Sequence, residues 1–264
     1  MRDCAAETLE DVQGRADPRA IAIQRVGVKA VRHPLRISDR GGRIQHSIAL
    51  CNMYVALPAH LKGTHMSRFL EILNQYPEPV GVANIDSFLE EVRHRLEAEE
   101  ARVELRFPYF VNKKAPVSGV ESLLDYEVEI QAERTAAGLR LELGVMVPVT
   151  SLCPCSKSIS DYGAHNQRSH VWVRADTRQT VWIEDIIDLV ESVASCQLYG
   201  LLKRPDEKFV TEYAYDHPKF VEDMVRDVAL RLRQDRRIRR FTVSSENFES
   251  IHNHSAYAEI QMDN

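Results

Sequence analysis

Stretches in which polar and apolar residues alternate dominate this chain, and they come in pairs. Alternation of this kind is typical of half-buried β-strands, whereas apolar residues three or four positions apart indicate amphipathic helices. An Asp- and Gly-rich turn at 38–42 joins the first two strands as a hairpin. The first half therefore predicts two strands, two helices and two strands, at residues 26–35, 44–57, 66–73, 85–96, 101–111 and 122–133.

The second half repeats that order without visible sequence identity to the first. Its predicted strands and helices are residues 139–147, 169–174, 184–199, 218–232, 241–243 and 257–260. The chain is therefore expected to be an α+β protein with two tandem ββααββ modules, at 21–136 and 137–264, that form one structural unit behind a loose leader at 1–20. Antiparallel sheets with helices on one face leave two open edges, so we expect oligomerisation to close the sheets into a β-barrel.

Composition narrows the function classes. With 264 residues, of which 44% are hydrophobic, the chain can bury a sizeable core. The net charge of −5 argues against a protein built to bind nucleic acid. No run of 18 apolar residues predicts a membrane span, and the N-terminus has no apolar signal core, so we expect a cytoplasmic protein.

The most informative segment is the long loop at 148–170. It brings Cys153 and Cys155 close in sequence to His165 and His170. Thiolate and imidazole ligands suit zinc or a related divalent ion. A structural metal site would need a second closely spaced cysteine pair, which the sequence lacks, so a catalytic metal site is favoured. A structural metal site and a loop without metal remain the alternatives.

Two further segments carry specific polar groups. Residues 202–208 form the run LKRPDEK, and residues 245–256 form the run SENFESIHNHSA. Taken alone, the first is more typical of a solvated charged connection. The second suits a hairpin turn equally well, although two glutamates and two histidines in one turn suggest a functional role.

Taken together, these segments resemble a known family. The runs SLCPCSKSISDYGAHNQRSH, LKRPDEKFVTEYAYDHPKFVED and SSENFESIHNHSAYAEI are similar to the GTP cyclohydrolase IB family, prokaryotic enzymes of the tunnelling-fold superfamily. The segments DVQ, VGVKAVRHPLRI and RFPYFVNKKAPVSG are also similar to that family. The resemblance therefore covers nearly the whole chain, and its central motif is long enough to be specific.

The resemblance implies a metal site. The first cysteine of the C-P-C motif, the histidine of A-H-N-Q and the glutamate of R-P-D-E-K would be its ligands, and these are Cys153, His165 and Glu207. One divalent ion, zinc, manganese or iron, would occupy each active site. Cys155 would lie beside the ion and take part in catalysis.

The resemblance also implies residues for substrate and catalysis. Glu249 would anchor the guanine edge, while His252 and His254 would lie close to the reacting base or its ribose. Glu222 is a further catalytic candidate, although the position equally suits a solvated place on an amphipathic helix. The triphosphate needs cations, and the basic residues proposed for it are Lys114, Lys157 and Arg168.

The implied activity is conversion of GTP and water to dihydroneopterin triphosphate and formate, for folate or queuosine precursor synthesis. The family forms homotetramers with active sites at subunit interfaces, so the same is expected here. One rival hypothesis is another tunnelling-fold enzyme, such as a pterin synthase or a nitrile reductase with a cysteine nucleophile. The other is a metal-binding interaction protein without catalysis.

Overall fold

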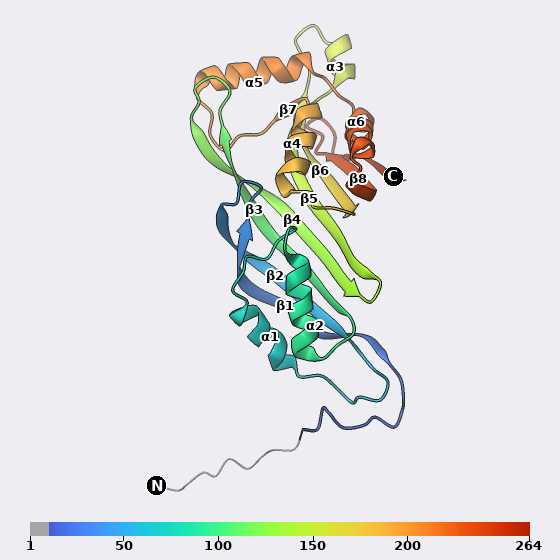
Figure 1. Cartoon of the computed structure of the whole chain (residues 1–264). Helices are drawn as coiled ribbons and strands as arrows, with labels where there is room; N and C mark the ends of the chain where they lie inside the picture. Colours follow the sequence, from blue (N-terminus) through green and yellow to red (C-terminus); the bar gives the residue numbers. More distant parts are fainter. Residues whose placement is uncertain (1–10) are drawn as a thin grey trace.

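The computed structural model describes residues 11–264, which form one large antiparallel sheet with helices packed on it (Figure 1). The order of elements in the first half matches the predicted strand-strand-helix-helix-strand-strand. Their bounds are β1 (Ile23–Ser38), β2 (Ile44–Leu57), α1 (Met66–Gln75), α2 (Ile85–Leu96), β3 (Ala101–Lys114) and β4 (Glu121–Thr135).

The second half follows the same order, with two helices and a short strand added to it. Its elements are β5 (Gly138–Leu152), α3 (Pro154–Ile159), β6 (Asn166–Thr177), α4 (Ile183–Val193), β7 (Cys196–Gln197), α5 (Arg204–Asp216), α6 (Val221–Gln234), β8 (Ile238–Asn247) and β9 (Ala256–Asp263). The sequence suggested a loop where α3 lies, a helix where β7 lies and a charged connection where α5 begins.

The sheet is continuous from one half to the other. Its strands lie in the order β1-β2-β3-β4-β5-β6-β8-β9, all neighbours are antiparallel, and β7 pairs with β5 off this path. The predicted α+β class with antiparallel strands is therefore confirmed. Because residues 127–135 of β4 pair with residues 138–146 of β5, no break in the sheet marks a boundary between modules. The proposed modules at 21–136 and 137–264 stay a prediction.

The helices cover one face of this sheet and bury a single core. Figure 1 shows α1 and α2 over one half of the sheet and α4 and α6 over the other. Phe69 and Phe88 are buried in the first half, and Val190 and Leu232 are buried in the second. Each fully buried side chain of this size contributes about 1.5–3 kcal/mol, so the shared core holds both halves together.

Two predictions for the second half were wrong. The helix expected at 184–199 ends at Val193, because Cys196 and Gln197 pair with β5 instead. Residues 202–208, which taken alone suggested a charged connection, include the start of helix α5 at Arg204. Both differences come from contacts with distant parts of the chain, which apolar periodicity does not record.

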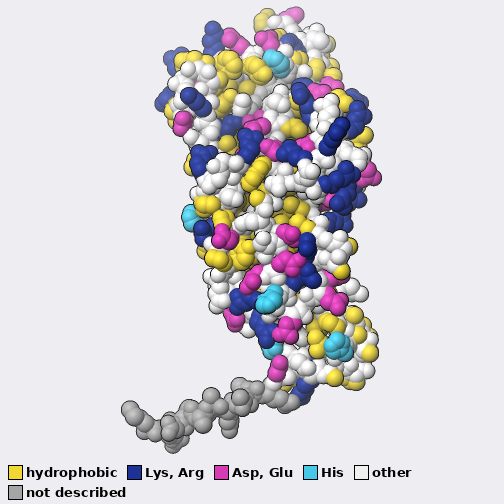
Figure 2. Space-filling model, in the orientation of Figure 1, with side chains coloured by type: hydrophobic (Ala, Val, Ile, Leu, Met, Phe, Trp, Pro, Cys, Tyr) yellow, Lys and Arg dark blue, Asp and Glu magenta, His cyan; other side chains and the backbone are white. Residues whose placement is uncertain are grey.

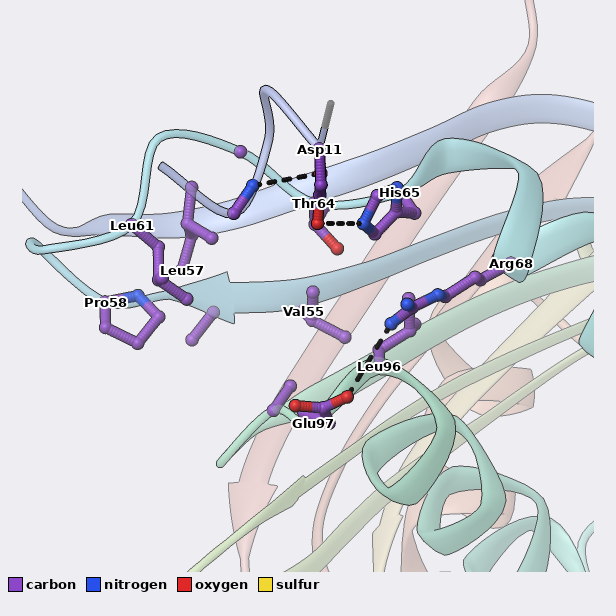
Figure 3. A pocket seen from close by; sticks show the side chains of 14 residues that line it. Asp11, Val55, Leu57, Pro58, Leu61, Thr64, His65, Arg68, Leu96 and Glu97 are labelled. Atoms are coloured by element: carbon purple, nitrogen blue, oxygen red, sulfur yellow. Dashed lines mark hydrogen bonds and ion pairs between the residues drawn. The ribbon is translucent and has the colours of Figure 1, made fainter. Parts of the chain in front are cut away.

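The N-terminal segment is attached to the first half at the loop after β2. Within the described residues, the backbone N–H of Gly63 donates to Gln13 and that of Lys62 donates to Arg15. Figure 3 shows Asp11 beside His65 at the start of α1, with 3.3 Å between Oδ2 and Nε2. The part of the expected loose leader that lies within 11–20 is thus tied to the domain, while residues 1–10 lie outside the described part.

The surface has no dominant sign of charge on the face that Figure 2 shows, where lysine and arginine side chains are interspersed with acidic ones. This arrangement agrees with the modest net charge of −5. Among the helices of residues 11–264, none combines the length and the apolar character that crossing a membrane requires.

Candidate active site

Seven of the predicted site residues line one cavity of about 420 Å³. The cavity lies at the end of the sheet where α3, α6 and the segment after β8 meet (Figure 1). Its apolar lining includes Phe220 and Ile251, whose side chains are partly exposed to the open space. The seven predicted residues are Cys153, Cys155, His165, Glu222, Glu249, His252 and His254.

Cys153 and His165 are held together by the ends of two paired strands. Cys153 follows β5, His165 precedes β6, and the backbone N–H of Cys153 donates to the carbonyl of His165 at 3.1 Å. Ser156 adds a second connection, since its Oγ accepts the N–H of His165 and donates to the carbonyl of Cys153, both at 3.2 Å. The thiol and the imidazole are therefore fixed on the same wall of the cavity.

The short helix α3 begins at this wall. Cys153 is its N-cap residue, and Sγ accepts the backbone N–H of Ser156 at 3.5 Å. Pro154 takes the first helical position, where the missing N–H is not needed. One turn of helix then leaves Cys155 exposed at the cavity. The two cysteines thus differ in setting, since Cys153 caps α3 and is half-buried whereas Cys155 is exposed.

The turn between β8 and β9 adds a carboxylate and two imidazoles to the lining of the cavity. The Glu249 side chain is only 13% exposed, and its Oε2 lies 3.4 Å from Nδ1 of His252. The rings of His252 and His254 stack with their centroids 5.1 Å apart. Buried Asn247 anchors the end of β8, because its amide bonds to Ser169 and Ser151. The turn therefore starts from a fixed point.

Glu222 enters the cavity from the first turn of α6. Asp223 caps this helix by accepting the backbone N–H of Phe220 at 3.1 Å, so the start of α6 is fixed beside the cavity. Glu222 is exposed, as expected for a solvated helix position, but it also lines the cavity. Its catalytic role stays a prediction.

Glu207 does not line this cavity. It lies in the first turn of α5, about 12 Å along the helix axis from Tyr215 in the last turn. The carbonyl of Tyr215 accepts a hydrogen bond from Lys157 of α3. Within residues 11–264, no three His, Cys, Asp or Glu side chains of the single chain form a group able to hold a metal ion. One chain therefore brings Cys153 and His165 together but leaves Glu207 apart from them.

The neighbouring Asp206 fixes where Glu207 lies. Asp206 is fully buried, and its carboxylate accepts the backbone N–H groups of Val117, Ser118 and Lys203, each at 2.8 Å. Burial opposes ionisation, but the hydrogen bonds from Ser118 and these N–H groups outweigh it and hold the Asp206 pKa well below its usual value. The start of α5 is thus bonded to the β3–β4 loop, with exposed Glu207 presented outward.

The three predicted triphosphate-binding cations do not line the catalytic cavity. Lys157 lies on α3, where its Nζ bonds to the Tyr215 carbonyl and lies 4.2 Å from the centre of the Tyr215 ring. Arg168 lines a cavity of about 290 Å³ beneath α5, and Lys114 lines another of about 560 Å³ between β3 and α5. Their proposed contact with phosphate stays a prediction.

The structure also separates the two histidines of the long loop. His170 does not line the cavity, and its ring packs edge-on against Phe248 with centroids 4.7 Å apart. Burial, aided by the charge of Arg168, lowers the pKa of His170 and favours the neutral ring. Of the two histidines of the long loop, His165 is therefore the one available to a ligand in the cavity.

Sequence reasoning missed several residues of this site. Phe220 offers a ring to the cavity, Gln167 contacts His165, and Asn247 fixes the turn that carries Glu249. All three stand inside or beside the motifs that were recognised. Their roles depend on neighbours from other strands and helices, so spacing along the chain does not reveal them.

The cysteines of the described part are expected to differ in their reactivity toward an alkylating reagent. In metal-free native protein at pH 8, iodoacetamide should modify exposed Cys155, while Cys51 and Cys196 stay unmodified. Burial raises the pKa of each buried thiol to about 11, which leaves a thiolate fraction of about 10⁻³ at pH 8. Peptide mass spectrometry checks this order, and zinc should slow labelling of Cys153. Faster labelling of Cys196 than of Cys155 would contradict it.

The donor set at the cavity fits a divalent ion. A thiolate sulfur and an imidazole nitrogen on one wall are ligands that zinc and related ions accept. Two such ligands do not complete a catalytic site, which usually has three protein ligands and an open position. Within residues 11–264 of one chain, this cavity therefore presents two of the three predicted ligands, Cys153 and His165.

The fold and the cavity define the class of protein. This is an antiparallel α+β protein whose catalytic candidates converge at one end of the sheet. A uricase from Arthrobacter globiformis shares the fold, with a TM-score of 0.53 at 8% identity over 91% of this chain and 93% of that chain. This likeness supports a tunnelling-type fold and nothing finer.

The family is shown by sequence. Residues 9–258 match the family model described as type I GTP cyclohydrolase folE2. GTP cyclohydrolase FolE2 of Nitrosococcus oceani is 62% identical over 96% of this chain and 95% of its own length. The FolE2 of Aromatoleum aromaticum is 60% identical over 100% and 97%. The chain belongs to the FolE2 family of type I GTP cyclohydrolases.

Proposed function

We propose that this chain is a metal-dependent GTP cyclohydrolase of the IB type that converts GTP and water to 7,8-dihydroneopterin triphosphate and formate. The product would enter folate synthesis and also serve as a queuosine precursor. One observation carries the proposal: seven residues from three separate motifs line a single cavity. Family membership agrees with this activity, and the rival tunnelling-fold enzymes and the non-catalytic metal protein are disfavoured by it.

Glu249 is suited to read the guanine edge. A carboxylate only accepts hydrogen bonds when ionised, and guanine offers an N–H and an amino group side by side. Adenine lacks this pair of donors, so a mostly buried carboxylate would be left without partners by ATP. The Phe220 ring in the same cavity offers an apolar surface to the base.

Protons must reach the two imidazole nitrogens of guanine as the carbon between them leaves as formate. Cys155, His252 and His254 line the cavity, and thiol and imidazole side chains are among those that serve as general acids and bases. A positioned acid or base of this kind contributes about 10²–10⁴-fold to the rate. Contact between Glu249 and His252 would also orient one of these imidazoles.

Cys153 and His165 would hold the divalent ion, with Glu207 as the third protein ligand. When bound, the ion would supply Lewis acidity, which lowers the pKa of water from about 15.7 toward about 7. Zinc, manganese and iron are all compatible with a thiolate, an imidazole and a carboxylate. The residues of this chain then orient the base and move protons around it.

Glu207 would come from a second copy of the chain. The first turn of α5 carries the exposed carboxylate of Glu207, whereas α3, which follows Cys153, contacts the last turn of α5 through Lys157 and Tyr215. Within residues 11–264 of one chain, no third His, Cys, Asp or Glu side chain completes a metal site with Cys153 and His165. The sheet also leaves β1 and β9 as open edges, which pairing between copies would close into a barrel. We therefore propose a cytoplasmic homotetramer whose active sites lie between subunits.

Turnover of GTP tests the proposal directly. Protein stripped with a chelator and reloaded with zinc, manganese or iron is incubated with GTP, and formate and oxidised pterin fluorescence are measured together. We expect formate and pterin in equal amounts from GTP, none from ATP, and no turnover without metal. Failure of all three metals to support formate release from GTP would contradict the proposed function.

A further inference from the structure

Gln167 makes a specific contact with the predicted metal ligand His165. It lies near the start of β6, opposite Ser151 of β5, and only 8% of it is exposed. Its Oε1 lies 2.9 Å from Nδ1 of His165, and both residues line the catalytic cavity. The contact therefore joins a buried strand position to the ring that faces the open space.

This contact has a direct consequence for the tautomer of His165. A neutral imidazole carries one N–H and one lone pair, on different nitrogens. An amide oxygen can only accept, so the nitrogen that faces it must carry the proton. With the proton on Nδ1, the lone pair of His165 lies on Nε2 and is available to a metal ion.

The surroundings hold His165 in this arrangement from both sides. The backbone N–H of His165 donates to Ser156, and its carbonyl accepts from Cys153, so the backbone is fixed. The remaining freedom is rotation of the ring, and Gln167 removes it. Contacts of this kind orient a ligand histidine and raise its affinity for metal.

We propose that Gln167 is a positioning residue of the metal site, which holds His165 as the Nδ1–H tautomer so that Nε2 binds the ion. The proposal deepens the proposed function, on which it rests for the ligand role of His165. Loss of such a contact typically weakens metal binding by about 10–100-fold.

Two substitutions separate this role from a merely structural one. Gln167→Leu keeps the approximate size but removes the accepting oxygen, while Gln167→Glu keeps an oxygen that accepts from Nδ1–H. Asn166→Ala is the matched control, because Asn166 is the exposed neighbour on the same strand and lies outside the catalytic cavity. A structural role would be seen as a change in melting temperature, whereas a positioning role changes zinc affinity and the tautomer.

Zinc affinity is measured by competition with a chromophoric chelator, and the His165 tautomer by nitrogen-15 NMR of the metal-free protein. Gln167→Leu is expected to bind zinc about 10–100-fold more weakly than the wild type. The Glu variant should stay within a few fold, and the Asn166 variant should be unchanged. The metal-free wild type should show the proton on Nδ1.

Two results would overturn the inference: zinc binding by Gln167→Leu as tight as in the wild type, or a proton on Nε2 of His165 in the metal-free wild type. If the Leu variant does not fold, the wild-type tautomer and the Glu variant still decide. A wild type that binds none of zinc, manganese and iron would instead contradict the proposed function. The tautomer measurement needs no metal, so the two failures are distinguishable.

Discussion

Replacing Cys153 by alanine is expected to remove the divalent ion and nearly all turnover of GTP. A bound ion contributes several kcal/mol of transition-state stabilisation, and each 1.36 kcal/mol is tenfold in rate. We therefore expect kcat/KM to fall on the order of 10³-fold or more. Metal analysis and formate release, measured on the same preparation, check both parts of the prediction.

The loss should not come from unfolding. Cys153 is only half-buried, and its side chain accepts one long hydrogen bond, from the backbone N–H of Ser156 at 3.5 Å. Loss of an N-cap acceptor costs about 1 kcal/mol, so the metal-free variant should unfold close to the metal-free wild type. A Cys153→Ala protein that keeps full metal content and full turnover would remove Cys153 from the metal site.

Much of the fold could be predicted because its signals are local. Tyr126, Val128 and Ile130 alternate with glutamates, and all three side chains are buried on one face of β4. Helix α6 follows the same logic, since its stripe of Met224, Val225 and other apolar residues is buried. In each case the periodicity of the sequence matches the periodicity of burial.

Helix α5 was not predicted because its stability depends on distant residues. Its sequence RPDEKFVTEYAYD is mostly polar, and only Asp206 and Ala214 are fully buried. The start of the helix is fixed by hydrogen bonds from the β3–β4 loop to Asp206, across almost 90 positions of sequence. Periodicity cannot record such a contact, although the run R-P-D-E was available as an N-terminal signal.

The sequence could predict which residues belong to the candidate site, but not how they are arranged in space. Motif resemblance named seven of the residues that line the cavity, including Glu249 and His165. It could not show that Gln167 contacts His165, that His170 faces Phe248 instead, or that Glu207 lies elsewhere in the single chain. Those facts depend on which side chains share a wall, which only the folded strands and helices decide.

The position of Glu207, apart from Cys153 and His165 in the single chain, predicts that two inactive variants regain activity when their chains are mixed. Glu207→Gln and Cys153→Ala should each be inactive as pure proteins, because each lacks one metal ligand. When the two chains are co-expressed with different tags and purified as mixed oligomers, activity should return. If each site takes Cys153 and His165 from one subunit and Glu207 from another, random mixing leaves about a quarter of sites with all three ligands.

The matched control is a mixture of Cys153→Ala with His165→Ala. These two residues share one wall of one chain, joined by the hydrogen bond between Cys153 and the His165 carbonyl, so no mixed site can contain both. This mixture should stay inactive, and formate release from each tag-purified oligomer measures the difference. Inactive oligomers that contain both the Glu207→Gln and the Cys153→Ala chains would place all three ligands in one subunit, and a Glu207→Gln protein that is active alone would remove Glu207 from the site.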